Sequence, residues 1–500
     1  MSAHSHVAIR NLTFSYEASP TPIFQEVTLN FPPGFTGIIG PNGSGKTTLL
    51  RLLVGELVAD SGDVEGTDNA IYCEQRTDSA PVLLDEFLQD WEGEAASLRS
   101  RFGIEWDFLE RWHTLSHGER KRTQVATALW RRPQVLTIDE PTNHIDRVAR
   151  DVLLENLKKF EGVGLLISHD RDLLDDLCHQ CVWIDPPAAR MYSGGYSSAR
   201  EQRSALREST LKERAKAKQS VRRLHAESAS RRETAASEPQ RRSKRGLAPK
   251  DNDGRGRINK AINTDGKSGN TLRQLDGRIA QAEARLEQSV VQKEFETGIW
   301  LEDSRSRRSY IVEMPAAGVE LNESRRLTWP DLTVGVSARI AVTGPNGSGK
   351  STFINRLLPK INAPPEHIIY LPQEISEQDC ASALVNVLRL PDDQLGKLMT
   401  IVSRLGSRPG RLIDSELPSP GETRKLLLAL GMLKLPHAII MDEPTNHLDV
   451  LSIEALEQAL ADCPCAIILV SHDEAFIGAL DMQRWQISEH EAGESVLAPI

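Results

Sequence analysis

The chain has 500 residues and a formal net charge of −10, with 39% hydrophobic residues and a mean hydropathy of −0.37. This length allows about three domains, the six cysteines are too few for a disulfide framework, and no stretch has the roughly 18 uncharged apolar residues of a membrane span. Residues 1–7 contain neither a basic leader nor an apolar core, so we expect a cytoplasmic protein without a secretory signal.

The elements of the first half follow an α/β pattern. Residues 7–14 alternate as a strand does, and the apolar run 35–39 leads into a glycine-rich loop with a helical pattern over 47–53. The runs 135–138 and 163–167 are short and almost entirely apolar. Such runs are typical of buried parallel strands.

A phosphate-binding loop occurs twice. The sequence GPNGSGKT at 40–47 returns as GPNGSGKS at 344–351, after the strand pattern 338–343. In such loops glycines let backbone N–H groups turn toward phosphates, the lysine reaches the β- and γ-phosphates, and the following hydroxyl contacts Mg²⁺. The residues predicted to hold ATP are Gly40, Asn42, Gly43, Ser44, Gly45, Lys46, Thr47 and Thr48, and Gly344, Asn346, Gly347, Ser348, Gly349, Lys350, Ser351 and Thr352.

Two further motifs repeat in the same register. The run DEPTNH at 139–144 returns at 442–447, and SHD at 168–170 returns at 471–473. The lysines, glutamates and histidines are offset by 304, 303 and 303 residues, which indicates a duplicated nucleotide-hydrolysing module. The predicted Mg²⁺ ligands are Asp139 and Asp442, with the hydroxyls of Thr47 and Ser351. The predicted catalytic residues are Glu140 and Glu443, which polarise the attacking water, with His169 and His472 beside the γ-phosphate.

The middle of the chain differs from the two halves in composition and charge. Residues 201–280 contain 21 Lys and Arg against 10 Asp and Glu, a balance of +11 that leaves −21 on the rest. Residues 200–235 read as a long exposed helix, 239–270 as a polar basic tip broken by glycines, and 272–286 as a second helix. This order predicts a projecting helical hairpin; the alternative is a disordered, solvated tether.

We therefore expect a first cassette over 1–198, a basic helical hairpin linker over 199–295, and a second cassette over 296–500. The fold class is α/β, with two tandem P-loop NTPase domains joined by the hairpin. The pairs Cys178/Cys181 and Cys463/Cys465 have metal-like spacings, but no second matching pair completes a zinc site. Buried thiols in helix-to-strand segments are the favoured interpretation.

The motif Leu115-Ser116-His117-Gly118-Glu119, 23 residues before Asp139, resembles the signature of the ATP-binding cassette superfamily. This resemblance implies an intramolecular pairing of the cassettes in a monomer, with two composite sites. Ser419 and Gly421 would close the site of Lys46, and Ser116 and Gly118 the site of Lys350. Pro418 and Pro420 flank Ser419, which departs from the family pattern and removes a backbone donor.

Other family landmarks are also present. Gln75 and Gln373 match the glutamine that completes the Mg²⁺ site in the family. Tyr16 matches the aromatic residue that stacks on adenine, whereas no aromatic residue stands near Glu320 in the second half.

The doubled Glu-Pro-Thr-Asn-His run, followed by Ile145-Asp146 or Leu448-Asp449, resembles the F-type branch (ABC-F), as does Tyr192-Ser193-Gly194-Gly195-Tyr196. Members of that branch are tandem cassettes whose linker enters the ribosomal exit-tRNA site. Only 40 residues separate Gln75 from Ser116, which leaves no room for the arm of housekeeping members and resembles the antibiotic-resistance members. The basic tip residues expected to meet rRNA and tRNA phosphates are Arg241, Arg242, Lys244, Arg245, Lys250, Arg255 and Arg257.

The sequence thus predicts an ATP hydrolase that forms ADP and phosphate, uses ATP and Mg²⁺, and binds the ribosome through residues 241–257. Its expected role is to shift tRNA and dislodge a bound antibiotic. One alternative is a translation or ribosome-assembly factor of the same family without a drug role. The other is the ATPase subunit of a transporter, which the basic hairpin and the doubled Thr-Asn-His disfavour.

Overall fold

The structure of the protein is a computed structural model. It describes residues 6–17, 21–142, 145, 147–237, 274–287, 306, 308–322, 325–407, 419–446, 448–490 and 494–500. The basic tip 241–257 and the residues Asn143, His144, Asp146, Pro418 and His447 lie outside this part of the chain. The chain divides into two compact units, Met1–Ala199 with Phe295–Ile500, and Arg200–Glu294. Across the described ranges, we find no helix with the length and apolar character that a bilayer crossing requires.

The first cassette is built on a six-stranded sheet with the order β5-β6-β7-β3-β8-β9, in which only β8 and β9 are antiparallel neighbours. Its strands are β3 (Gly34–Ile39), β5 (Ala70–Cys73), β6 (Val135–Asp139), β7 (Val163–Ile167), β8 (Cys178–Asp185) and β9 (Ala188–Ser193). A separate antiparallel sheet contains β1 (Val7–Phe14), β2 (Phe24–Phe31) and β4 (Ser61–Glu65). The helices are α1 (Lys46–Leu53), α2 (Leu84–Gln89), α3 (Gly93–Phe102), η1 (Trp112–Thr114), α4 (His117–Trp130), α5 (Arg147–Leu157) and α6 (Arg171–Leu177).

Buried residues on both faces explain why β6 and β7 are apolar throughout. Successive strand residues point to opposite faces, so Leu136 and Ile138 enter the core shared with α3, α4 and α5. Val135 and Ile167 enter the other core, shared with α1, β1 and β2. The prediction of buried parallel strands is confirmed at both positions.

The second cassette repeats this plan on an eight-stranded sheet with the order β11-β12-β19-β18-β14-β17-β16-β15, beside the pair β10-β13. The strands are β10 (Tyr310–Met314), β11 (Ala317–Asn322), β12 (Arg325–Trp329), β13 (Leu332–Gly335), β14 (Arg339–Thr343), β15 (Ile368–Leu371), β16 (Ala438–Asp442), β17 (Ala466–Val470), β18 (Gln483–Glu489) and β19 (Glu494–Pro499). The helices are α9 (Lys350–Leu357), η3 (Leu358–Lys360), η4 (Pro365–His367), α10 (Glu377–Leu388), α11 (Asp392–Arg404), α13 (Pro420–Met432), α14 (Val450–Ala461) and α15 (Glu474–Ala479). β19 pairs in parallel with β12 and antiparallel with β18.

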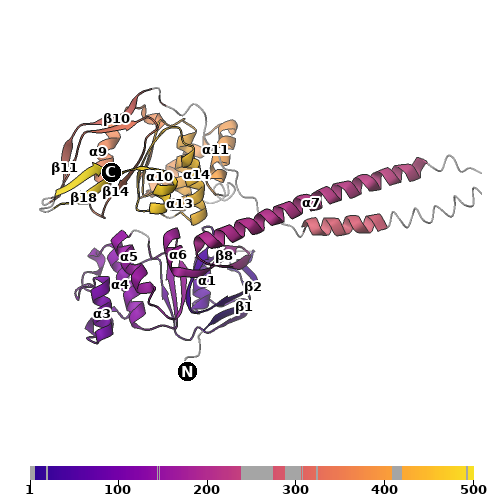
Figure 1. Cartoon of the computed structure of the whole chain (residues 1–500), viewed down its shortest axis with the longest axis horizontal. Helices are drawn as coiled ribbons and strands as arrows, with labels where there is room; N and C mark the ends of the chain where they lie inside the picture. The colour runs from indigo at the N-terminus through magenta and orange to yellow at the C-terminus, as the bar shows by residue number, and fades with distance from the viewer. Residues whose placement is uncertain are drawn as a thin grey trace, which may run out of the picture. The chain divides into compact units, whose positions relative to one another are not determined.

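The second unit contains most of α7 (Tyr196–Ser237) and a helix over 274–287 (Figure 1). The helices are antiparallel, because His225 pairs with Glu283 at 3.0 Å and Arg232 with Asp276 at 3.1 Å. Leu224, Leu275 and Ile279 form a small core between them. The hairpin that the sequence predicts is thus present as far as the described residues extend.

Candidate active site

Each phosphate-binding loop joins a central strand to a helix. The chain leaves β3 at Ile39, passes through Gly40–Gly45 and enters α1 at Lys46; the second loop joins β14 to α9 in the same way. Gly45 and Gly349 have φ of 96° and 97°, a left-handed conformation that favours glycine. A Cβ on Gly45 would also lie 2.5 Å from Ile23 Cγ2. Glycine is therefore required where the loop turns into the helix.

The polar groups of both loops fit a phosphate. Lys46 Nζ donates to the carbonyls of Gly40 and Pro41 at 2.9 and 3.2 Å, and Lys350 Nζ donates to the equivalent carbonyls at 2.8 and 2.9 Å. Ser44 Oγ and Ser348 Oγ are buried without a hydrogen-bond partner in the described structure. Buried polar atoms of this kind call for a partner, which the phosphate oxygens of ATP would supply.

The predicted Mg²⁺ ligands are adjacent in both cassettes. Thr47 Oγ1 donates to Asp139 Oδ2 at 2.7 Å, and Ser351 Oγ donates to Asp442 Oδ2 at 2.7 Å. Burial raises the pKa of both aspartates. A hydroxyl and a carboxylate at the end of a buried strand are the oxygen ligands that Mg²⁺ takes beside a nucleotide, so these residues would hold it.

Glu140 and Glu443 follow β6 and β16 with φ of 48° and 47°, which is unusual for residues other than glycine. Their N–H groups donate to Ile167 O and Val470 O at 2.9 and 2.8 Å, which fixes this strained backbone. Residues held in rare conformations cluster at functional sites. The same conformation at both positions supports the catalytic role predicted for these carboxylates.

The two glutamates differ in their electrostatic environment. Glu140 Oε1 lies 2.9 Å from His169 Nε2, whereas Glu443 Oε1 lies 3.5 Å from His472 Nε2. Burial by itself would raise the pKa of Glu140, but the charge and hydrogen bonding of His169 lower it below the ordinary value. Burial raises the pKa of Glu443 to about 8 against the pull of Lys350. The two sites are therefore not electrostatically equivalent.

Tyr16 lies close to the start of α1. Its hydroxyl is 3.0 Å from Thr48 Oγ1 and the residue is 41% exposed; stacking of adenine on its ring stays a prediction. Gln75 and Gln373 are exposed just beyond β5 and β15. Sequence reasoning missed Tyr72, whose hydroxyl donates to Asp139 Oδ2 at 3.2 Å.

The signature serines begin α4 and α13. Ser116 and Ser419 are N-caps of these helices, each in a capping box with the glutamate three residues later. Pro420 occupies the first turn of α13. The first N–H groups of a helix have no partner within it, so proline is well tolerated there. Pro420 has no backbone N–H, but an N–H at this position would have no acceptor within the helix, so the helix loses no hydrogen bond.

Two buried cations were also missed by sequence reasoning. Lys121 donates to the carbonyls of Glu74 and Asp139. Arg424, at the equivalent place on α13, donates to Gln373 O at 2.7 Å and Glu443 O at 2.6 Å. Each cation thus ties the glutamine loop to the end of the catalytic strand. The sequence feature that could have identified them is a basic residue five positions after each signature serine, on a helix that packs against the sheet.

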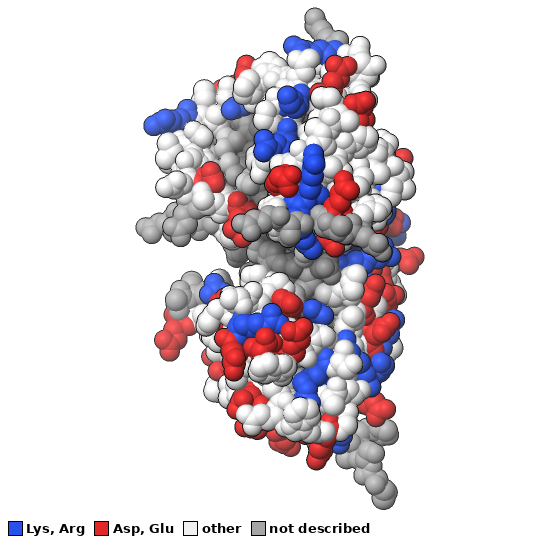
Figure 2. Space-filling model, turned by 90° about the vertical axis from the view of Figure 1, so that its left-hand side faces the viewer, with Lys and Arg blue, Asp and Glu red and all other residues white. Residues whose placement is uncertain are grey.

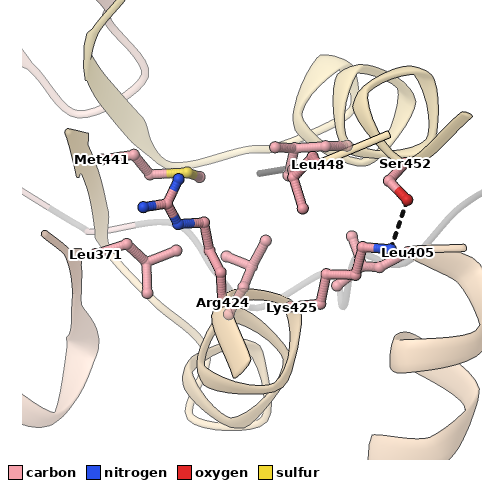
Figure 3. A pocket seen from close by; sticks show the side chains of 9 residues that line it. Leu371, Leu405, Arg424, Lys425, Met441, Leu448 and Ser452 are labelled. Atoms are coloured by element: carbon pink, nitrogen blue, oxygen red, sulfur yellow. Dashed lines mark hydrogen bonds between the residues drawn. The ribbon is translucent and has the colours of Figure 1, made fainter. Parts of the chain in front are cut away.

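Arg424 and Lys425 also line a small pocket whose wall includes Leu371, Met441 and Leu448 (Figure 3). Lys425 Nζ donates to Ser452 Oγ at 2.6 Å, and Ser452 Oγ donates to Asp449 Oδ1 at 2.8 Å. All three side chains are buried, so the charges of Lys425 and Asp449 are largely shielded from water.

The same aspartate reaches the first cassette. Asp449 Oδ2 accepts a hydrogen bond at 2.8 Å from the N–H of Asn42 in the first phosphate-binding loop. The network Lys425–Ser452–Asp449–Asn42 therefore joins the second signature helix to the first nucleotide site. The pairing of Lys46 with Ser419 and Gly421, and of Lys350 with Ser116 and Gly118, stays a prediction.

A second contact between the cassettes is the ion pair of Arg171 and Glu457. Arg171 donates through both terminal nitrogens, one at 3.0 Å, and the side chains are only 13% and 12% exposed. We expect Arg171→Ala to destabilise the pairing of the cassettes by about 2–5 kcal/mol, because Glu457 is left buried without its partner. A double-mutant cycle with Glu457→Ala, followed by thermal unfolding, measures the coupling.

The matched control for this cycle is Arg147, which pairs with Glu474 at 3.5 Å while 72% exposed. Removing an exposed pair of this kind is expected to cost about 0–1 kcal/mol. Equal effects at Arg171 and Arg147 would contradict the prediction.

Comparison with known proteins agrees with this geometry. The family model described as "ABC transporter" matches residues 24–143 and 327–446. The ATP-binding protein Uup of Caulobacter vibrioides is 30% identical, over 92% of this chain and 74% of that protein. The ribosome protection protein VmlR of Bacillus subtilis is 27% identical, over 93% and 83%. The tylosin resistance ATP-binding protein TlrC of Streptomyces fradiae is 27% identical, over 94% and 95%.

Among solved structures, one titled RNase-L Inhibitor superposes with a TM-score of 0.59 at 17% identity, over 99% of this chain and 90% of that chain. This likeness concerns the fold, two tandem P-loop NTPase domains with a long helical segment. Together with the matched cassettes and the relatives above, it leads to one assignment. The chain belongs to the ABC-F family of tandem ATP-binding cassette ATPases.

Proposed function

We propose that the chain binds two Mg-ATP between its cassettes and inserts the basic hairpin tip, residues 241–257, near the ribosomal tRNA site. This action protects the ribosome from a bound antibiotic. VmlR is named a ribosome protection protein and TlrC a tylosin resistance protein, and the chain aligns with more than four fifths of each. These relatives carry the proposal.

The uneven distribution of charge along the chain supports RNA as the partner. Residues 201–280 carry +11 while the rest carries −21, and on the face in Figure 2 basic side chains are interspersed with acidic ones. A basic limb on an acidic body directs phosphate contacts to the limb. Binding to RNA through it should weaken steeply with salt.

The residues of each cassette have distinct parts in hydrolysis. The chemistry that Mg²⁺ would supply when bound is neutralisation of charge on the β- and γ-phosphates. Lys46 and the N–H groups of residues 43 and 45–47 would bind those phosphates, and Thr47 with Asp139 would hold the metal. Glu140 accepts a proton from the attacking water, and His169, 2.9 Å away, fixes the carboxylate. In the second cassette the same roles fall to Lys350, Ser351, Asp442, Glu443 and His472.

An alternative is a translation or ribosome-assembly factor without a drug role. It is favoured by Uup, which has a higher identity than VmlR and whose name mentions only ATP binding. Both functions use the same nucleotide sites, and they differ in whether a drug leaves the ribosome.

The test uses the variant with Glu140→Gln and Glu443→Gln, sedimented with ribosomes with and without ATP. ATP-dependent co-sedimentation is expected, and alanine at the seven tip arginines and lysines should weaken it. The slope of log K against log salt should fall by up to about one unit for each contact removed. Lys158→Ala with Lys159→Ala, two exposed lysines of the first cassette, is the control.

Release of labelled antibiotic from the trapped complex separates the two functions. Release supports protection, whereas tight binding without release supports the factor role. If the trapped protein stays in the supernatant with ATP present, the ribosomal proposal is wrong.

A further inference from the structure

Two cysteines outside the nucleotide sites lie side by side after α14. Cys463 Sγ and Cys465 Sγ are 3.0 Å apart, with Pro464 between them in the chain. Cys463 is 6% exposed, whereas Cys465 is 0% exposed. The thiols are close enough to react with each other, and Cys463 is the more exposed of the two.

The two thiols are also chemically unequal. The hydrogen bond between the two thiols lowers the pKa of Cys463 below its ordinary value, and the charge of Arg339 adds to this effect. The same hydrogen bond, together with burial, raises the pKa of Cys465. Arg339 is fixed by hydrogen bonds to the carbonyls of Leu480 and Ala461. Because the thiolate is the reactive form, the lowered pKa and the greater exposure of Cys463 favour it as the nucleophile and Cys465 as the resolving thiol.

We propose that Cys463 and Cys465 are a redox-active dithiol that hydrogen peroxide closes into a disulfide. The Cys463 thiolate attacks one peroxide oxygen and the O–O bond breaks, which leaves a sulfenic acid and releases the other oxygen as hydroxide; this hydroxide takes the proton that the Cys463 thiol lost on ionisation and becomes water. The Cys465 thiol then attacks the Cys463 sulfur, so the S–S bond forms, the S–O bond breaks and a second water leaves. The dithiol loses two electrons and two protons, which reduce the peroxide.

The position of the pair connects it to the nucleotide sites. α14 begins directly after Asp449, and its Glu454 accepts a hydrogen bond from Tyr196 of the first cassette at 2.6 Å. β17, which follows Cys465, ends two residues before His472. A disulfide would join the end of α14 to the start of β17. We therefore expect the oxidised form to hydrolyse ATP about twofold more slowly, with recovery after reduction.

The experiment treats the full chain with hydrogen peroxide, alkylates the remaining thiols and maps the cysteines by mass spectrometry. The expected product is a Cys463–Cys465 disulfide that dithiothreitol reverses. Cys178 and Cys181 are an internal control, because they are as buried as Cys463 and Cys465 but burial raises the pKa of each, that of Cys181 to about 12. They should stay reduced when the Cys463–Cys465 disulfide has formed.

Two variants test the order of attack. In Cys465→Ser, dimedone should trap a sulfenic acid on Cys463; in Cys463→Ser, labelling of Cys465 should be about tenfold slower. Equal labelling, no disulfide in the wild type, or earlier oxidation of Cys178 and Cys181 overturns the dithiol. A disulfide that leaves ATP hydrolysis unchanged overturns its link to the nucleotide sites.

Discussion

Replacing Glu140 and Glu443 together by glutamine is expected to lower the ATP turnover number about 10²–10⁴-fold, the usual contribution of a positioned general base. Glutamine keeps the volume and the hydrogen-bonding capacity of the side chain but cannot accept the proton of the attacking water. ATP binding should persist, because the phosphates are held by the glycine-rich loops and their lysines. Steady-state phosphate release gives the turnover number, and equilibrium binding of a fluorescent ATP analogue gives the affinity.

The single variants and an exposed carboxylate provide the controls. Glu161→Gln makes the same chemical change on an exposed side chain of the first cassette and should leave turnover unchanged. Each single variant should retain hydrolysis at the other site. A double variant that keeps more than about a tenth of the wild-type turnover would contradict the assignment of these glutamates as general bases.

The strands, loops and helix that could be predicted are encoded by residues close to one another in the sequence. The strands β6 and β7 are apolar at nearly every position because both faces are covered, and such a run is visible without knowledge of the partners. The phosphate-binding loops and acidic strand ends are likewise continuous in sequence, so their residue types and spacing suffice. The same holds for α7, whose composition favours a helix throughout.

Features that depend on distant partners could not be predicted. Asn42 and Asp449 are 407 residues apart, and nothing local marks the N–H of one as the donor for the other. Lys121 and Arg424 bind backbone carbonyls, which carry no side-chain signature. The pairing of His225 with Glu283 also depends on the register between two helices, which their composition leaves open.

Lys425→Met is expected to destabilise the second cassette by about 3 kcal/mol, because it leaves the buried charge of Asp449 uncompensated. Methionine fills a similar volume but leaves Ser452 without its donor and Asp449 without its compensating charge, since both are buried. The midpoint of thermal unfolding should fall by roughly 6–12 °C for a cassette of this size. ATP should also bind more weakly at the first site, because Asp449 fixes the N–H of Asn42.

Two further variants separate a cross-cassette network from simple loss of packing. Arg122 occupies the equivalent place on α4, but its guanidinium donates to Phe102 O at 2.9 Å, within its own cassette. Arg122→Met should therefore leave ATP affinity at the second site unchanged. Adding Asp449→Asn to Lys425→Met removes the uncompensated charge, so part of the lost stability should return, as it does when both members of a buried pair are neutralised. If the double variant is as unstable as the sum of the single ones, Lys425 and Asp449 act independently and no network joins α13 to the first nucleotide site.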